Sequence, residues 1–381
     1  MIGFDLTSDQ KALQEKARRF AREVILPVAA KHDREGSFPR DVIEKAYEEG
    51  YLTPLVPKEY GGGGLGVLDT CLLSEELAAG DMGIFVSIFV STLALYPIII
   101  FGNNDQKEQF LRPFCKEFSL ASYCLSEPHA GSDPSSMHTT ASLEGDSYLL
   151  NGTKMWITNG GYANLYLVFA NTDRQKKHKG IISLIVPADS PGIRHGEPID
   201  KMGQRASNTT AITFKNVRVP LKNLLAGEGE GFKKAMVALD ITRPMIAVGA
   251  VGLARKAMEL ATQYAKQRIQ FDVPIANHQA VQFLLADMAI GIDAARLLVW
   301  RAAYMADQGR RNTREAAIAK AFAADVAMKV TTDAVQIYGG MGYTKWHAVE
   351  KLMRDAKVIQ IYEGSAQIMR KIIGRYQLDN M

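Results

Sequence analysis

Cysteine is scarce in this sequence, and its placement excludes several kinds of protein. Only 3 of the 381 residues are cysteine, at the scattered positions Cys71, Cys115 and Cys124, and no CxxC pair occurs. None of the 7 histidines stands at the spacing of a metal-ligand pair. Disulfide-stabilised proteins and structural zinc sites need such pairs. We therefore expect no disulfide framework and no metal, and a reducing compartment.

An excess of charge of one sign is also lacking. Lysine and arginine number 45 against 41 aspartates and glutamates, a formal net charge of +4, and the basic residues are spread along the chain. A nucleic-acid-binding protein concentrates its basic residues on one face. The one local basic cluster, residues 174–179, lies in polar sequence, which is typical of a solvated hairpin tip. We expect no nucleic acid among the partners.

No apolar run is long and uninterrupted enough to suggest a membrane span. The longest, residues 84–101, carries Ser87, Ser91 and Thr92 and is interrupted by Pro97, whereas a membrane helix requires about 20 consecutive apolar residues. The first residues lack the basic, apolar and small-residue zones of a signal peptide. We expect a soluble protein without membrane insertion, in the bacterial cytoplasm, or in the mitochondrial matrix if the chain is a processed one.

The hydrophobic period changes twice along the chain. To about residue 118 the apolar residues recur at helical spacing, and the glycine run 61–64 indicates a loop between helices. From there to about Asn223, short alternating segments are separated by regularly spaced turns, a pattern of short β-strands. Beyond residue 231 the helical spacing returns, most clearly at 244–268, 278–308 and 313–338.

These changes predict an α+β multidomain protein, and the length favours roughly two to three domains. We predict an N-terminal α-helical domain (residues 1–118), a central β-barrel or β-sandwich domain (119–226) and a C-terminal helical domain (227–381).

Several common motifs are missing. No GxxxxGK[ST] loop occurs, and no GxGxxG stands between a predicted strand and a helix. GxSxG and HExxH are also missing. The sequence therefore favours neither a nucleoside triphosphate cradle nor a dinucleotide-binding doubly wound sheet.

Four local clusters carry residues able to bind a polar ligand. The first, at 123–133, offers backbone N–H groups and hydroxyls, although an ordinary turn has the same composition. The second, at 154–161, places an indole beside a threonine, which suits a planar ligand but also a plain core strand. The third combines 268–271 with 278–279, and the fourth, 354–367, contains a glutamate before a glycine that alone is compatible with a solvated loop.

Together the clusters resemble the acyl-CoA dehydrogenase family, most closely its short- and medium-chain, straight-chain members. The segments that carry the resemblance keep the family's order over nearly the whole chain and read YCLSEPHAGSD, KMWITNGG, MGQRASNT, TRP, QRIQF, HQA, QIYGGMGY, MRDAK and IYEGSAQI. The resemblance implies a helical domain, a β domain and a C-terminal four-helix bundle, with non-covalent FAD between the last two. It also implies a homotetramer, an acyl-CoA substrate and electron-transfer flavoprotein as the electron acceptor.

The resemblance further implies a set of site residues. Glu363 would be the catalytic base, removing the α-proton while the β-hydride passes to the flavin, and the product would be a trans-2-enoyl-CoA. The FAD would be contacted by Tyr123, Leu125, Ser126, Gly131, Ser132, Trp156, Ile157, Thr158, Tyr362, Ser365 and Gln367. The FAD of a neighbouring subunit would be reached by Arg268, Gln270, Phe271, His278, Gln279, Gln336, Gly339 and Gly340. The substrate would contact Ser132, Asp240, Arg243, Glu363 and Gly364.

The chemistry demands more than a carboxylate. An α-proton beside a thioester is too weakly acidic for a carboxylate in water, so the site must stabilise the enolate-like charge as it develops. The resemblance assigns this task to a ribityl hydroxyl of FAD and to the backbone N–H of Glu363, whose burial should raise its pKa. Isovaleryl-type relatives carry the base earlier in the chain, where this sequence has Thr242, which cannot serve.

Some positions depart from the family's pattern. Ser126 stands where threonine is common, Asp272 stands where glycine is usual, and KWH at 345–347 replaces an acidic-aromatic-proline stretch. The resemblance implies that the helix with Phe85, Phe89 and Tyr96 floors the acyl pocket, so we expect a short or medium acyl group, with a cyclic one as the alternative. An oxidase that hands electrons to oxygen, and a non-catalytic scaffold on the same fold, are the rival functions.

Overall fold

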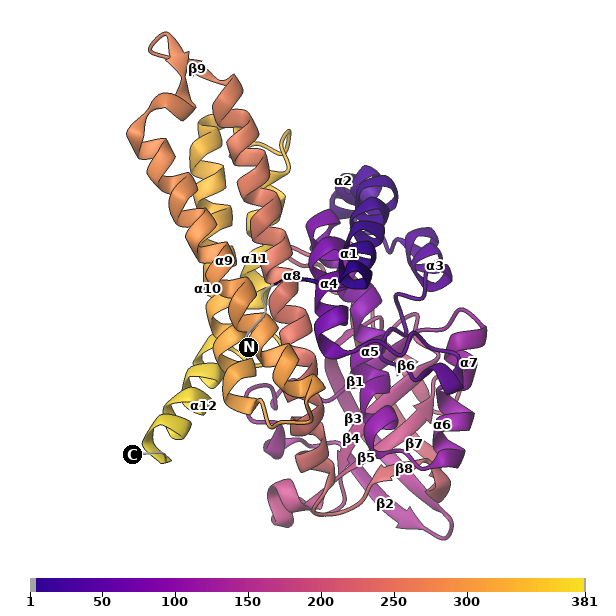
Figure 1. Ribbon diagram of the computed structural model, residues 1–381. Helices are drawn as coiled ribbons and strands as arrows, with labels where there is room; N and C mark the ends of the chain where they lie inside the picture. The colour runs from indigo at the N-terminus through magenta and orange to yellow at the C-terminus, as the bar shows by residue number, and fades with distance from the viewer. Residues whose placement is uncertain (1–4, 380–381) are drawn as a thin grey trace.

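Helices form the N-terminal part of the structure, a computed structural model that describes residues 5–379. They are α1 (Ser8–Phe20), η1 (Ala21–Ile25), α2 (Leu26–Glu35), α3 (Arg40–Glu48), η2 (Lys58–Tyr60), α4 (Val67–Gly80), α5 (Met82–Phe101), α6 (Asn104–Phe110) and α7 (Arg112–Lys116). The first begins at a capping box, in which Thr7 accepts a hydrogen bond from the backbone of Gln10 and the Gln10 side chain accepts one in return. α4 and α5 are buried over most of their length and pack between the sheet and the C-terminal helices (Figure 1).

The central part is one open, mixed sheet. Its strands are β1 (Ala121–Cys124), β2 (Thr140–Glu144), β3 (Ser147–Thr158), β4 (Leu165–Asn171), β5 (Ile181–Pro187), β6 (Ile193–His195), β7 (Thr209–Pro220) and β8 (Leu224–Ala226). The order is β6-β7-β3-β2-β4-β5-β8, and β1 runs parallel to β4. The β-domain prediction is confirmed, but its barrel alternative is wrong: the end strands β6 and β8 are three residues long and do not pair with each other, so the described strands close no barrel.

The C-terminal part is a helical bundle, as predicted. α8 (Gly231–Gln267), α9 (Gln279–Asp307) and α10 (Thr313–Tyr338) pack side by side, α11 (Val349–Ile359) lies against α8 and α10, and α12 (Ala366–Asp379) packs on α10. A small hairpin of β9 (Ile269–Gln270) and β10 (Val273–Pro274) joins α8 to α9 at the end of the bundle remote from the sheet (Figure 1). The three-part architecture is thus confirmed, while the residue boundaries between the domains stay predictions.

Two helices continue through a proline. α5 contains Pro97, and α8 starts at Gly231, thirteen residues before Pro244, where the sequence indicated a helix start. A proline inside a helix frees the carbonyl four residues earlier. For Pro244 that carbonyl belongs to Asp240, and it accepts a hydrogen bond of 3.1 Å from Asn312 Nδ2. This tertiary contact explains why the helix continues through Pro244.

In the part of the chain that the structure describes, two helices, Met82–Phe101 and Gly231–Gln267, are long and apolar enough to cross a membrane. In each, however, 78% of the most apolar window is buried within the protein. Both therefore have the surroundings of core helices.

The three parts of the chain meet at a buried charge cluster. The Lys351 ammonium on α11 lies 2.5 Å from Asp81 Oδ2, at the start of α5, and 2.5 Å from Asp355 Oδ2. Asp355 also accepts a hydrogen bond from the backbone N–H of Gln204, in the segment that leads into β7. The Gln204 side chain donates to the hydroxyl of Tyr362 at 3.2 Å. One network therefore ties all three parts to the residue that precedes Glu363.

Candidate active site

Glu363 stands in the turn between α11 and α12 and adopts a backbone conformation unusual for its type. Its φ is 54°, in the left-handed region that non-glycine residues rarely enter. Its Oε2 atom is buried and, within residues 5–379, has no hydrogen-bond partner. Burial raises the pKa of the Glu363 carboxyl above its usual value, against the opposing effect of the cations Arg243 and Lys320. A desolvated carboxylate with an unused acceptor is suited to take up a proton.

Arg243 and Asp240, both on α8, form a linked pair of side chains beside the turn that carries Glu363. Arg243 Nε donates to the backbone carbonyl of Glu363 at 3.0 Å, and its other end pairs with Asp240 Oδ1 at 2.6 Å. Asp240 Oδ2 in turn accepts from the Thr313 hydroxyl at 2.6 Å. The Arg243 side chain is only 5% exposed, so its charge acts inside the protein. Its predicted contact with CoA stays a prediction.

Two tyrosines border the carboxylate. The Tyr123 hydroxyl on β1 is buried without a partner among the described residues, and burial, with a further contribution from Glu363, raises its pKa. Tyr362 is held through Gln204, as described above. Thr242, the position of the base in isovaleryl-type relatives, is fully buried and donates to Ala238 O at 3.1 Å. The structure therefore gathers Tyr123, Tyr362 and Arg243 around Glu363.

A buried ion pair organises the loop that follows β1. Lys154 Nζ lies 2.8 Å from Glu127 Oε1 and donates to Leu125 O at 3.1 Å, and both charged side chains are almost fully buried. Glu127 also accepts from the backbone N–H groups of His138 and Thr139. The pair therefore closes the loop on itself and holds it against β3.

Trp156 is displayed on the surface beside this loop. The register of β3 against β7 shifts between Lys154 and Ile157, and within this bulge Trp156 has φ 64° and an exposed fraction of 57%. Strain of this kind at an exposed aromatic is typical of a ligand contact. The neighbouring Thr158 accepts, through its carbonyl, a bond of 2.7 Å from the Ser122 hydroxyl. The backbone N–H of residue 155 donates to the carbonyl of Ser126 at 2.9 Å, which joins the loop directly to the bulge.

A second group of predicted residues lies at the other end of the bundle. Arg268, Gln270, Gly339 and Gly340 line a cavity of about 400 Å³ there, together with Tyr264 and Tyr338. Phe271, Gln279 and Gln336 are exposed in the same region, and the Nε2 atom of His278 is buried without a partner among residues 5–379. Arg268 follows Arg243 by 25 positions on α8, which is about 37 Å along a helix axis. Within one chain the second group therefore lies remote from Arg243 and from the Glu363 turn that Arg243 contacts.

The remaining predicted residues show no specific arrangement. Gly131 and Ser132 are exposed in the loop after β1, and Gln367 is exposed on α12. The Ser365 hydroxyl accepts a bond of 3.2 Å from Ile368 N, which places it at the start of α12. Their contacts with FAD or substrate stay predictions.

Three residues for which the sequence predicted no role of their own hold the site together: Lys320, Lys154 and Gln204. Lys320 and Lys154 have no exposed surface, and Gln204 is 3% exposed. The one available signal was a lysine within the alanine-rich stretch of 316–324, where a solvated face is the usual explanation. Their roles depend on contacts between distant segments.

Asp272, one of the departures from the family's pattern, has a physical consequence. Phe271 and Asp272 form the two-residue turn between β9 and β10 with φ of 54° and 63°. Glycine and asparagine favour such a turn, so aspartate at the second position is conformationally costly but tolerated. The structure offers no account of KWH at 345–347 beyond the ring of His347 lying 5.2 Å from that of Tyr338.

Comparisons with known proteins agree with this geometry. Family models described as the N-terminal, middle and C-terminal domains of acyl-CoA dehydrogenase match residues 7–117, 122–217 and 229–378. The chain is 41% identical to the rat short-chain specific acyl-CoA dehydrogenase, over 98% of this chain and 91% of that protein. The solved butyryl-CoA dehydrogenase of Megasphaera elsdenii is 41% identical, with a TM-score of 0.96 over 99% and 100% of the two chains. A structure described as the electron transferring flavoprotein of Acidaminococcus fermentans is 44% identical, with a TM-score of 0.97 over 99% and 100%.

These likenesses, with the fold and the site, define an oxidoreductase that uses FAD. The chain belongs to the acyl-CoA dehydrogenase family. The residues present fit the cofactor: the indole of Trp156 offers a face for a planar ring, and the hydroxyl of Tyr123, buried without a partner among residues 5–379, can bond to a polar ring edge. The predicted contacts of Arg268 and Gln270 with the FAD of a neighbouring subunit stay predictions.

Proposed function

We propose that this protein dehydrogenates a short- or medium-chain acyl-CoA thioester to the trans-2-enoyl-CoA, with Glu363 as the base, and passes the electrons to electron-transfer flavoprotein. The observation that carries the proposal is that Glu363 Oε2 is buried in a strained turn without a hydrogen-bond partner among residues 5–379. FAD, when bound, supplies the acceptor for the β-hydride. Membership of the family supports FAD-dependent acyl-CoA dehydrogenation. The length of the acyl group and the identity of the electron acceptor are the proposal's own additions.

The chain's own residues provide the proton chemistry. Removal from water raises the pKa of Glu363, so the carboxylate becomes a stronger base than it is in solution. The charge on Arg243, directed at the Glu363 carbonyl, keeps the carboxylate ionised often enough to act. Among the described residues the Glu363 backbone N–H has no acceptor, so it is free to donate to the thioester oxygen as negative charge develops.

Replacement of the base is the direct test. Purified Glu363→Gln should keep FAD and its fold, and under anaerobic conditions acyl-CoA should bleach its flavin at least about 100-fold more slowly than in the wild type. Glu144→Gln, an exposed glutamate on β2, is the matched control and should bleach at the wild-type rate. Bleaching of Glu363→Gln at the wild-type rate would exclude Glu363 as the base.

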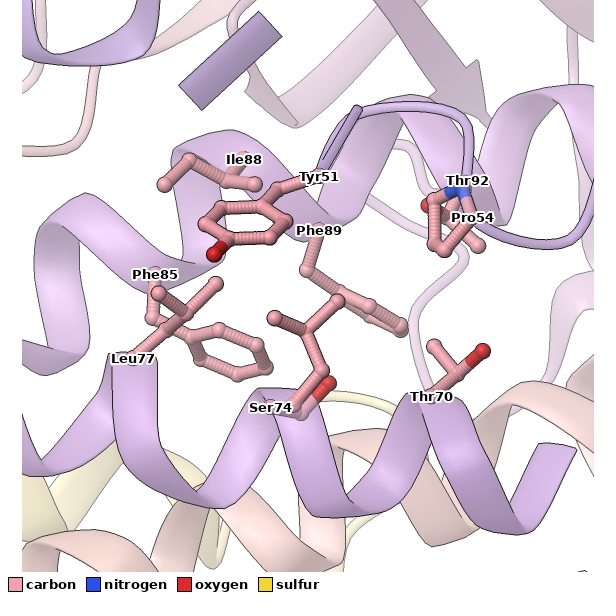
Figure 2. A pocket seen from close by; sticks show the side chains of 10 residues that line it. Tyr51, Pro54, Thr70, Ser74, Leu77, Phe85, Ile88, Phe89 and Thr92 are labelled. Atoms are coloured by element: carbon pink, nitrogen blue, oxygen red, sulfur yellow. The ribbon is translucent and has the colours of Figure 1, made fainter. Parts of the chain in front are cut away.

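A short or medium acyl group is favoured by the packing between α4 and α5. The rings of Phe85 and Phe89 are stacked with centroids 5.7 Å apart, and the cavity beside them measures about 10 Å³ (Figure 2). Such a space is close to the minimum that holds one water molecule, so a long acyl chain cannot enter here without displacing an aromatic ring. Phe89→Ala should therefore move the optimum of kcat/KM toward longer acyl chains. An unchanged optimum would show that the acyl chain ends elsewhere.

A homotetramer is supported by a stripe on α9. Its apolar side chains Phe283, Ile290, Leu297 and Tyr304 are each about half exposed or more and follow one another at intervals of seven residues. Such spacing puts them on one helix face, where a second copy can pack. The separation of the two groups of predicted FAD residues supports the same assembly, because each FAD would need residues from two chains.

The assembly has its own test. Light scattering should give the mass of four chains for the wild type and a smaller mass, with loss of FAD, for Ile290→Asp. Leu143→Asp places the same charge on an exposed residue of β2 and should stay tetrameric. A monomeric wild type that retains FAD would contradict the proposal.

The electron acceptor separates this function from the oxidase. The likeness to the structure described as an electron transferring flavoprotein supports a flavoprotein acceptor. Reduced enzyme should be reoxidised rapidly by electron-transfer flavoprotein and slowly by air. Rapid reoxidation by air alone would establish an oxidase instead.

A further inference from the structure

Lys320 is a buried lysine without an ion-pair partner among residues 5–379. It lies on α10 with no exposed surface, and no described carboxylate is within ion-pair distance of its ammonium. It donates a hydrogen bond to the backbone carbonyl of Gly364. Burying a charge is costly unless it serves a partner. We therefore look for the role of Lys320 in its hydrogen bond to the Gly364 carbonyl.

Two cations from different helices hold the turn that carries the base. Arg243 on α8 donates to the carbonyl of Glu363 at 3.0 Å, and Lys320 on α10 donates to the next carbonyl, that of Gly364. Both residues of this turn have left-handed backbones, with φ of 54° at Glu363 and 93° at Gly364. Such conformations persist only where surrounding contacts enforce them. A Cβ on residue 364 would collide with the methyl group of Met369, so the turn is also closely packed.

We propose that Lys320 is a positioning residue: by holding the Gly364 carbonyl it fixes the direction of the Glu363 carboxylate and N–H, and its charge supports the ionised form of that carboxylate. The inference rests on the proposed role of Glu363 as the base. Lys320 touches neither substrate nor cofactor in this scheme. It acts through the peptide that follows the base.

The charges around Lys320 make the effect measurable. Glu363 faces it from the turn and Arg243 from α8, while Asp325 lies on its own helix and is paired with Arg370 of α12. Burial lowers the pKa of Lys320 to about 8, against the opposing effect of Glu363. Lys320 in turn lowers the pKa of Glu363, whose burial raises it. Removing the Lys320 charge should therefore raise the pKa of Glu363 further.

Lys320→Met is the main variant, since methionine keeps the volume and loses both the charge and the donor. We expect kcat to fall about 100-fold, the loss that a misplacement of about 1 Å causes, with KM changed less than about threefold. The acid limb of the kcat–pH profile should move to higher pH by about one unit. FAD content, and binding of the enoyl-CoA product followed by flavin absorbance, should match the wild type. Lys329→Met, an exposed lysine on the same helix, is the control and should retain wild-type kinetics.

Lys320→Arg separates positioning from mere filling of space. It restores charge and donors, so it should recover at least about tenfold of the kcat lost in Lys320→Met and return the acid limb toward the wild-type pH. Wild-type kcat and pH profile in Lys320→Met would overturn the inference, as would a Lys320→Met protein that loses FAD or unfolds, because the lysine then serves only the fold. A wild type that oxidises no acyl-CoA would instead be a failure of the proposed function, visible before any variant is made.

Discussion

Replacing Lys351 by methionine leaves two buried carboxylates without the cation between them. Lys351 lies 2.5 Å from both Asp81 and Asp355, whose side chains are at most 1% exposed. Removing one partner of a buried ion pair costs about 3–5 kcal/mol. Asp81 keeps its hydrogen bond from Ile84 N and Asp355 keeps the one from Gln204 N, so we expect the lower part of this range, about 3 kcal/mol.

The pH dependence gives this prediction its sign. The two carboxylates hold the pKa of Lys351 above its usual value, so the ammonium stays charged through the pH range of the assay. Burial raises the pKa of Asp355. A group with a raised pKa in the folded state contributes stability at low pH and loses it as the pH rises through that value. Without Lys351, Asp355 should keep its proton to still higher pH, so the stability deficit of Lys351→Met should shrink as the pH falls from about 8 to about 5.

Urea unfolding of the FAD-loaded protein, followed by circular dichroism at both pH values, measures the deficit. Lys357→Met is the matched control: it removes an exposed lysine from the same helix, which donates a hydrogen bond to Gln360, and should change the free energy of unfolding by less than about 0.5 kcal/mol. A Lys351→Met protein as stable as the wild type, or a deficit equal at the two pH values, would refute the reasoning.

Three further predictions follow from the buried charges and the strained turn. Lys320→Met should raise the free energy of unfolding at pH 7 by up to about 3 kcal/mol, because burial lowers the pKa of Lys320 from 10.5 to about 8 and so disfavours the charged lysine in the folded protein. Urea titrations should show this gain disappearing as the pH rises past about 10, where the lysine is neutral in both states. Lys154→Met should leave Glu127 buried without its counter-ion and, if the loop after β1 contacts FAD as predicted, lower the ratio of FAD to protein after gel filtration; a wild-type ratio would show that the ion pair does not serve FAD binding. Gly364→Ala should cost about 1–3 kcal/mol and most of kcat because of its φ of 93°, whereas Gly374→Ala on the open face of α12 should not lower either quantity in denaturation and rate assays.

The local pattern of the sequence was sufficient for the order of the elements. Each helix or strand buries one side, and the spacing of its apolar residues records this within the segment itself. The change from helical spacing to alternation and back therefore predicts the order of the elements. Local rules failed at Pro244, because the carbonyl that proline leaves free is satisfied by Asn312, about seventy positions later in the chain. They failed also for the barrel, because whether the end strands β6 and β8 meet is a property of the whole sheet.

The same division holds for the site. Ordered motifs around residues 123, 156 and 363 indicated a flavin and a base through their joint resemblance to the acyl-CoA dehydrogenase family, because none of them does so alone. Only the tertiary structure brought Lys320 and Arg243 onto adjacent carbonyls beside Glu363, and only it joined Asp81 to Lys351 across 270 positions. The physical reason is that the sequence alone predicts a solvated lysine, whereas burial and nearby charges, which set its pKa, depend on residues that are neighbours only in space.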